Sequence, residues 1–170
     1  VRIMDENDKE VPNGEPGEMC LRGGFMIGYW GMPEKTDEEL RENGFFITGD
    51  LGTISEDDYV SIVGRSKDLI ISGGYNVYPK EIEVLLDELD GVLESALIGI
   101  PHPDFGEGVV AVIVPQSGAK LNQETILAEM KDKIARFKHP KQIVFIDELP
   151  RNTMGKVQKI TLRERFAKLF

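Results

Sequence analysis

Two charged side chains stand next to glycines, where they could act on an anionic or hydroxylated ligand. Asp50 follows Gly49 at the predicted end of a strand, so a tight turn could project its carboxylate and let it accept two hydrogen bonds. Lys156 follows Gly155, whose missing side chain lets the backbone approach a ligand while the lysine supplies a positive point charge. An aspartate that caps its own turn and an ordinary surface lysine are the simpler interpretations of the same residues.

A third stretch, Gly64 to Glu83, contains two adjacent glycines, Gly73 and Gly74, after a short apolar run. Paired glycines after a strand indicate a turn with positive φ, or a place where a ligand comes close to the backbone. Pro79 fits the first turn of a helix that follows, because its missing N–H costs nothing there. A strand, a glycine turn and a helix with nothing bound would explain the pattern equally well.

In this order along the chain, the three stretches resemble the last motifs of the adenylate-forming superfamily, which includes acyl-CoA synthetases, peptide-synthetase adenylation domains and beetle luciferases. The residues that carry the resemblance are Ile47-Thr48-Gly49-Asp50-Leu51-Gly52, Gly64 to Glu83, and Leu149 to Val157. The resemblance runs from about Gly14 to the C-terminus. The text from Asn152 to Lys159 resembles malonyl-CoA synthetases most, and medium- and long-chain ligases next.

The resemblance implies a role for each charged residue in the first half-reaction, in which a carboxylate attacks the α-phosphate of ATP. Asp50 would hold the ribose hydroxyls, and Arg65 would lie near the same ribose and the α-phosphate. Lys156 would be the catalytic lysine, because joining two anions needs positive charge aimed at their oxygens. Lys67 falls at the family's hinge position, with Asp68 as the neighbouring candidate; an ordinary surface lysine is the alternative.

For the second half-reaction, the resemblance implies that the small domain rotates and a thiol displaces AMP. Gly73 and Gly74 would then line a tunnel for the pantetheine arm of CoA, where any Cβ would obstruct it. Phe137, Lys138 and His139 would grip the CoA nucleotide by stacking and by charge, with Phe105 near. Mg²⁺ would ride on the triphosphate of ATP, with its protein ligands in a lobe that this chain lacks.

Composition and charge limit the classes of protein to which this chain can belong. The chain has 170 residues, 41% of them hydrophobic, with mixed charge, as in a globular protein. Its net charge of −10 divides into about +7 from Lys131 onward and −17 before it. The acidic body argues against nucleic-acid binding, and the basic end suits phosphorylated small molecules, although a solvated lysine-rich helix face explains part of the excess.

Localisation is predicted from what the sequence lacks. No apolar run approaches the length of a membrane span, and no signal peptide opens the chain. The single cysteine, Cys20, excludes an internal disulfide and suits a reducing cytoplasm.

The pattern of apolar residues predicts an α+β fold. Residues 1–66 read as short strands and turns, the β-barrel-like end of a large N-terminal lobe, and residues 67–170 as a mobile C-terminal α+β domain with helices packed on a small sheet. Within that domain we expect three helices: one from Pro79 to about Leu89, one capped by Asn122 that carries residues up to Ile134, and one at the tail through Leu162, Phe166 and Leu169. Strands are expected at 92–100, 109–114 and 143–146.

Together these features predict the C-terminal fragment of an AMP-forming acyl-CoA synthetase, which adenylates a carboxylic acid with ATP and passes the acyl group to CoA. The acid would be malonate or a medium- or long-chain fatty acid. The chain alone would be inactive, because it needs its own N-terminal lobe for the ATP phosphates and the acyl pocket. The alternative is a stand-alone nucleotide- or CoA-binding module, or a regulatory one, without catalysis.

Overall fold

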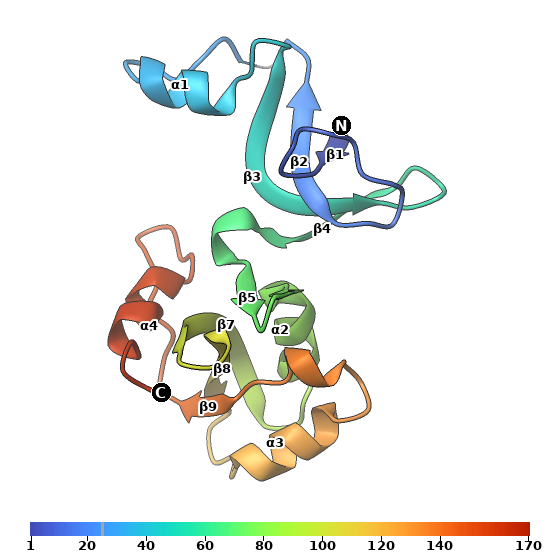
Figure 1. The fold of residues 1–170 in the computed structure, drawn as a ribbon. Coiled ribbons are helices and arrows are strands. Elements are labelled where there is room, and N and C mark those ends of the chain that lie inside the picture. The colour runs from blue at the N-terminus through green and yellow to red at the C-terminus, as the bar shows by residue number, and fades with distance from the viewer. Residues whose placement is uncertain (25) are drawn as a thin grey trace. The chain divides into compact units, whose positions relative to one another are not determined.

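The structure, a computed structural model, describes residues 1–24 and 26–170 (Figure 1). The described chain divides into two compact units, Val1–Lys67 (unit 1) and Asp68–Phe170 (unit 2). This division falls one residue beyond the boundary expected from the sequence, between residues 66 and 67. That unit 1 ends a larger lobe and that unit 2 moves as a domain remain predictions.

Unit 1 is an antiparallel sheet with one short helix. Its strand order is β1-β2-β3-β4, and Ile3, Met19, Cys20 and Leu51 are buried on it. Burial, together with the nearby Glu18 carboxylate, raises the pKa of the Cys20 thiol, so this cysteine packs as a small apolar residue. The elements are β1 (Arg2–Met4), β2 (Gly17–Arg22), α1 (Pro33–Glu39), β3 (Phe45–Ile54) and β4 (Val60–Arg65).

Asp50 does not end a strand, as the sequence suggested, but lies inside the ten-residue strand β3. In the pairing of β2 with β3, Cys20 lies opposite Ile47 and Glu18 lies opposite Leu51. Three residues of β3 (48–50) therefore lie opposite the single residue Met19 and form a bulge. Gly49 takes a positive φ of 72° at this point, which only glycine adopts without strain. The bulge turns the strand without ending it, and this explains why the Gly-Asp pair looked like a terminus.

Unit 2 is built on a mixed sheet of order β6-β5-β8-β7, in which β9 pairs parallel to β8. The long central pair β7–β8 is antiparallel from Val92 to His102. The elements are η1 (Ser66–Asp68, spanning the unit boundary), β5 (Ile70–Ser72), β6 (Tyr75–Val77), α2 (Pro79–Asp87), β7 (Val92–His102), β8 (Gly106–Pro115), α3 (Gln123–Met130), η2 (Arg136–Lys138), β9 (Gln142–Phe145) and α4 (Lys159–Arg165).

Alternating residues of β7 and β8 bury both faces of this sheet. One face carries Leu97, Val109, Ala111 and Ile113, and packs against Ile82 and Leu86 of α2 and Ile126 and Met130 of α3. The other carries Ala96, Ile98, Val110 and Val112, and packs against Leu162 of α4. We call them the α2–α3 face and the α4 face. Strands buried on both sides read as continuous apolar runs, which is how the sequence predicted them. The predicted α+β class is confirmed.

Local details differ from the sequence prediction in three places. Asn122 caps α3 as expected, with its side-chain oxygen 2.8 Å from the Thr125 N–H. That helix ends at Met130, however, so Ile134 packs on the core from the segment that follows. Likewise α4 ends at Arg165, and Leu169 lies beyond it. A short strand, β6, separates the paired glycines from α2 where the sequence suggested a direct turn into the helix.

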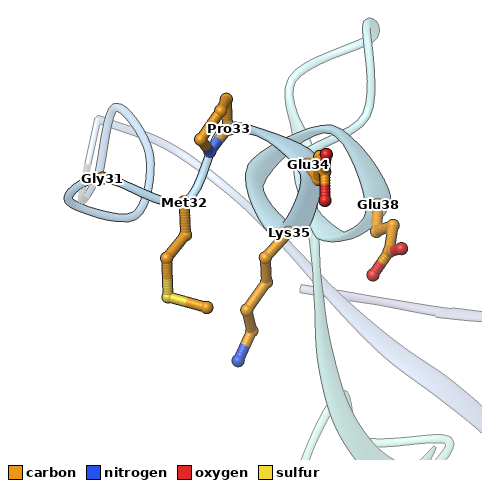
Figure 2. Close-up of a pocket in the computed structure, with 6 residues that line it drawn as sticks. All are labelled: Gly31, Met32, Pro33, Glu34, Lys35 and Glu38. Atoms are coloured by element: carbon orange, nitrogen blue, oxygen red, sulfur yellow. The ribbon is translucent and has the colours of Figure 1, made fainter.

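The surface of unit 1 has two open pockets beside α1. Figure 2 shows one of about 400 Å³, lined by Gly31, Met32 and Pro33 and by Glu34, Lys35 and Glu38 of α1. The other includes the almost fully exposed Trp30. No predicted site residue lines either pocket. Among the described residues no helix is long and apolar enough to cross a membrane.

Candidate functional site

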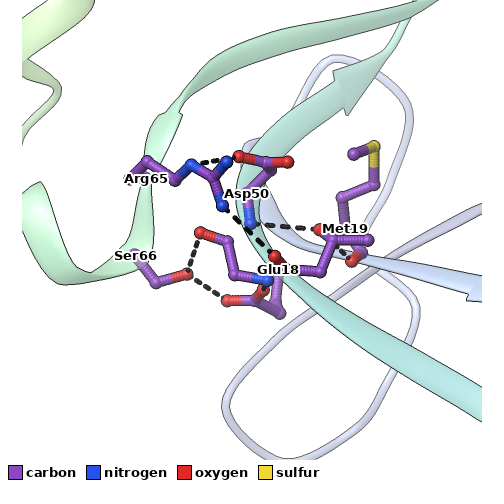
Figure 3. Close-up of polar contacts among 7 residues, drawn as sticks. Glu18, Met19, Asp50, Arg65 and Ser66 are labelled. Atoms are coloured by element: carbon purple, nitrogen blue, oxygen red, sulfur yellow. Dashed lines mark hydrogen bonds and ion pairs between the residues drawn. The ribbon is translucent and has the colours of Figure 1, made fainter. Parts of the chain in front are cut away.

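Asp50 and Arg65 lie directly opposite each other on neighbouring strands β3 and β4 (Figure 3). The Arg65 Nε lies 2.7 Å from the Asp50 Oδ1, and the carboxylate is 19% exposed against 49% for the guanidinium. A second guanidinium nitrogen is 3.4 Å from the Thr48 carbonyl oxygen. Both residues predicted to bind the nucleotide therefore meet at the bulge, where a fixed carboxylate and a charged fork are available together.

Glu18 supports this pair from strand β2, a role that was not predicted from the sequence. One carboxylate oxygen accepts a hydrogen bond from the Gly49 N–H at 2.9 Å, and the other accepts one from the Ser66 hydroxyl. The Ser66 hydroxyl also lies 3.4 Å from the Gly49 carbonyl (Figure 3). Glu18 thus joins the bulge that carries Asp50 to the residue that follows Arg65. Its partners lie 31 and 48 residues away, so no local pattern could have identified it.

The predicted hinge Lys67 is the middle residue of the short turn η1 and is exposed. Ser66 before it is bonded to Glu18 and Gly49 within unit 1. Asp68 after it pairs with Arg163 of α4 within unit 2, at 3.5 Å. Each neighbour of Lys67 is therefore anchored to a different unit, as a hinge confined to one residue requires.

The paired glycines form the tip of a hairpin between β5 and β6, which we call the glycine hairpin (residues 70–77). Gly73 and Gly74 take φ of 59° and 81°, the two positive values of a two-residue turn that suits strand twist. The Gly73 N–H donates to the Phe105 carbonyl at 2.9 Å. A Cβ on Gly74 would meet no atom within 4 Å, so nothing in the fold itself forbids a side chain there except the backbone conformation.

The residues predicted to grip the CoA nucleotide have partners within unit 2. The Phe137 ring stacks on Tyr75 of the glycine hairpin, with centroids 4.7 Å apart. The Lys138 ammonium lies 2.7 Å from both carboxylate oxygens of Glu81 and so already has an anionic partner within the domain. The His139 Nε2 is 3.2 Å from the Ile134 carbonyl. The three lie beside the hairpin, and their binding role stays a prediction.

Lys141 and Tyr75 are basic and aromatic residues at this edge that the sequence prediction missed. The Lys141 ammonium lies over the Phe105 ring, 4.8 Å from its centroid, and the Phe105 carbonyl accepts the Gly73 N–H. The Tyr75 ring is 59% exposed although it stacks on Phe137. The signal for Lys141 was present in the basic stretch after Lys131, but its position over an aromatic ring depends on contacts between distant segments.

Lys156 lies on a small hairpin of its own, residues 151–157, closed by a bridge between Arg151 and Val157 (the Lys156 hairpin). The Asn152 side-chain oxygen accepts hydrogen bonds from the N–H groups of Met154 and Lys156, at 3.0 and 2.9 Å. Gly155 takes a φ of 78°, which completes the turn. The Lys156 side chain is exposed at the end of this ordered element.

The two hairpins of unit 2 are anchored in different cores: the glycine hairpin consists of the sheet strands β5 and β6, and the Lys156 hairpin lies outside the sheet. Ile70 and Val77 of the glycine hairpin are buried in the core of the α2–α3 face. Leu149 and Val157, on either side of the Lys156 hairpin, pack in the core of the α4 face. Each hairpin is therefore held by its own set of apolar contacts within unit 2.

The described residues contain no group of three or more His, Cys, Asp or Glu side chains that could hold a metal ion. Mg²⁺ bound by the phosphates of ATP needs only one or two protein carboxylates, so its site stays a prediction, and no step below is assigned to a metal.

Comparison with known proteins places this geometry in a family. Residues 81–156 match the family described as AMP-binding enzyme C-terminal domain. The chain is 43% identical over 167 residues to a feruloyl-CoA synthase of an Amycolatopsis species, spanning 98% of this chain and 34% of the relative. It is 38% identical to a long-chain-fatty-acid–CoA ligase of Escherichia coli, over 96% of this chain and 29% of that protein.

Solved structures of relatives show the same fold as this chain. ATP-bound MatB from Rhodopseudomonas palustris superposes with a TM-score of 0.93 and 54% identity, over 99% of this chain and 34% of that one. Apo MatB superposes with a TM-score of 0.75 over the same segment, so the two structures of this relative differ there.

These likenesses define the class. The chain belongs to the adenylate-forming superfamily of AMP-binding enzymes, of which it carries the C-terminal domain. The relatives named above are acyl-CoA ligases, and one of them, MatB, is a malonyl-CoA synthetase, the kind of enzyme that the sequence motifs resembled most. The chain spans about a third of the length of these relatives.

Proposed function

We propose that this chain is the part of an AMP-forming acid–CoA ligase that completes the ATP site and then delivers CoA. The observation that carries the proposal is that two hairpins are anchored in separate cores of unit 2, the one bearing Lys156 in the core of the α4 face and the one bearing Gly73 and Gly74 in the core of the α2–α3 face. Such an arrangement lets one domain serve two half-reactions in turn, by presenting one face and then the other.

In the first half-reaction a carboxylate oxygen attacks the α-phosphorus of ATP, and pyrophosphate leaves. Asp50 accepts hydrogen bonds from the ribose hydroxyls, and Arg65 beside it supplies charge toward the α-phosphate. The Lys156 ammonium stabilises the negative charge that gathers when the two anions meet. The ordered Lys156 hairpin supports this role, because electrostatic stabilisation requires a charge held in place before the reaction.

In the second half-reaction the thiol of CoA attacks the acyl carbon, and AMP leaves. Rotation about Lys67 withdraws Lys156 and brings the glycine hairpin to the reaction centre. Gly73 and Gly74, both exposed and without side chains, then form the wall along which the pantetheine arm passes. Two different superpositions of MatB, ATP-bound and apo, support the existence of more than one arrangement in a relative.

The CoA nucleotide binds at the aromatic and basic edge beside the glycine hairpin. Phe137 with Tyr75 offers a stacking surface, and Lys138, His139 and Lys141 offer charge to its phosphates. For Lys138 to do so it must exchange Glu81 for a phosphate. We place the reaction in the cytoplasm, where Cys20 stays a reduced, buried thiol.

The acid is malonate or a medium- or long-chain fatty acid. Malonate is favoured by the 54% identity to MatB, whereas the feruloyl and long-chain ligases are more distant at 43% and 38%. The acyl pocket lies outside the chain, so these identities are the support for the substrate.

The test is turnover by the full-length enzyme with a panel of acids: malonate, octanoate, palmitate and ferulate. We expect AMP, pyrophosphate and the acyl-CoA in equal amounts, fastest with malonate, and no AMP from residues 1–170 alone. ADP as the product, or steady AMP release by the 170-residue chain, would contradict the proposal. ATP or CoA binding without turnover by the full-length protein would instead favour a binding or regulatory module.

A further inference from the structure

The segment that carries Lys156 is attached at both ends to the terminal strand β7. At one end Arg151 pairs with Glu94 of β7 and also donates to the Gly155 carbonyl at 2.8 Å. At the other end α4 begins at Lys159, three residues after Lys156. Lys159 reaches β7 through a single intermediate, Glu83 of α2. The reactive lysine thus stands between two fixed points.

The Lys159 attachment is the more buried of the two. The Lys159 ammonium lies 2.6 Å from the Glu83 Oε1, and the two side chains are only 15% and 10% exposed. The same carboxylate oxygen accepts the Leu97 N–H of β7 at 2.8 Å. Because β7 is the terminal strand, this N–H is not used by a further strand, and Glu83 satisfies it.

The pair also joins two helices that pack on opposite faces of the sheet. Glu83 belongs to α2, on the α2–α3 face, and Lys159 belongs to α4, whose Leu162 packs on the other face. Figure 1 shows α2 and α4 on either side of β7. A buried ion pair is costly to break, because removing one partner leaves the other as an unpaired buried charge. The start of α4 is therefore fixed in both directions.

We propose that Glu83 and Lys159 are positioning residues for Lys156, and that Arg151 and Glu94 form the weaker second attachment. The helix α4 needs such an attachment, since it has seven residues and no side chain caps its N-terminus. The inference rests on the proposed function of Lys156. Beyond that function, we propose that the Lys159 ammonium pairs with Glu83 inside the domain and thereby holds the neighbouring Lys156 hairpin in place.

Loss of the Glu83–Lys159 pair should slow one half-reaction and not the other. A misplacement of about 1 Å in a catalytic group can cost on the order of a hundredfold in rate. Loss of the Glu83–Lys159 pair should therefore slow adenylation about ten- to a hundredfold. Thioester formation depends on the glycine hairpin, which is held by the α2–α3 core, and it should change by less than about twofold.

The experiment compares Lys159→Met with Lys168→Met in the full-length enzyme, because Lys168 is exposed just beyond α4. Pyrophosphate exchange measures adenylation, and single-turnover CoA transfer from supplied acyl-adenylate measures the second step. We expect Lys159→Met to lower kcat for exchange with KM for ATP nearly unchanged, and Lys159→Arg to restore most of it. Lys168→Met should match the wild type in both assays. Equal losses in both half-reactions for Lys159→Met would overturn the proposal.

A double variant separates this inference from the proposed function. If Lys159 acts through Lys156, then Lys156→Ala with Lys159→Met should exchange no more slowly than Lys156→Ala alone. If the double variant exchanges more slowly than Lys156→Ala alone, so that the two losses multiply, the inference is wrong and the role of Lys156 is unaffected. An active Lys156→Ala single variant would instead overturn the proposed function. Should Lys159→Met not fold, Arg151→Gln at the exposed attachment tests the same claim, with a smaller loss expected and confined to exchange.

Discussion

At the scale of single residues, the proposed nucleotide site depends on the Asp50–Arg65 pair. The two side chains come from neighbouring strands, and the 2.7 Å contact fixes the carboxylate before any ribose binds. A carboxylate already held in one orientation loses little further freedom when two hydroxyls approach it. The bulge at Gly49 and the Glu18 carboxylate behind it maintain that orientation.

We therefore expect Asp50→Ala in the full-length enzyme to weaken ATP binding. Hydrogen bonds to a charged group contribute about 1.5–3 kcal/mol, which corresponds to roughly a ten- to a hundredfold higher Kd. Isothermal titration with ATP gives the Kd, and Asp57→Ala, an exposed aspartate at the β3–β4 turn, is the matched control. An unchanged Kd for Asp50→Ala would show that Asp50 merely orders its own strand.

Sequence patterns singled out the candidate site residues but not the residues that hold them. Asp50 and Lys156 were recognisable because each stands in a short motif beside a glycine. Glu18 and Glu83 were not, since their partners lie far away in the sequence and a lone glutamate resembles any surface carboxylate. The Glu83 carboxylate accepts a hydrogen bond from β7 and pairs with Lys159, two partners that no local pattern around Glu83 specifies.

At the scale of elements, hydrogen bonds hold the backbone of the Lys156 hairpin in one conformation before any substrate binds. Asn152 bonds two N–H groups of the turn, its own N–H donates to the Lys156 carbonyl at 2.9 Å, and Gln158 donates to the Pro150 carbonyl at 2.7 Å. These contacts fix the backbone that bears the lysine while its side chain stays exposed. The element thus supplies order without burying the charge.

Asn152→Ala should loosen this hairpin without unfolding the domain. The lost bonds lie at the surface, where water replaces them, so we expect stability to fall by no more than about 1 kcal/mol. Pyrophosphate exchange should fall roughly tenfold, because the charge is no longer held in place. Thr153→Ala, an exposed neighbour in the same turn, should behave as the wild type. A loss of stability that accounts for the whole loss of exchange would contradict this view of the hairpin.

Elements with strong apolar patterns were predictable, and those defined by pairing were not. The buried runs of β7 and β8 and the cap at Asn122 follow from local residue types. Strand β6 has three residues, of which two are exposed, and exists only because β5 pairs with it. The bulge in β3 likewise depends on its register with β2, which no short pattern specifies.

At the scale of the whole molecule, the proposed activity requires unit 2 to change its orientation. Ser66 is attached within unit 1 and Asp68 within unit 2, so a rotation would fall on Lys67. The sequence predicted this position from a motif, and the anchors on either side give it a physical basis. The anchoring of the two hairpins in separate cores is consistent with the two orientations that the proposed activity requires.

The most direct test measures the two half-reactions separately in full-length enzyme with one change on each hairpin. Lys156→Ala removes a charge contributing about 3 kcal/mol to the first step, so pyrophosphate exchange should fall roughly a hundredfold while CoA transfer from supplied acyl-adenylate persists. Gly74→Leu should do the reverse, with exchange retained and CoA transfer reduced about tenfold or more by a side chain in the thiol path.

Gly118→Leu is the control for Gly74→Leu, since Gly118 has a matching φ of 83° against 81° and equally open surroundings in another turn. It should leave both half-reactions unchanged, which separates obstruction from backbone strain. We expect Lys156→Ala to impair pyrophosphate exchange and Gly74→Leu to impair CoA transfer. Equal impairment of both half-reactions by each variant would contradict it.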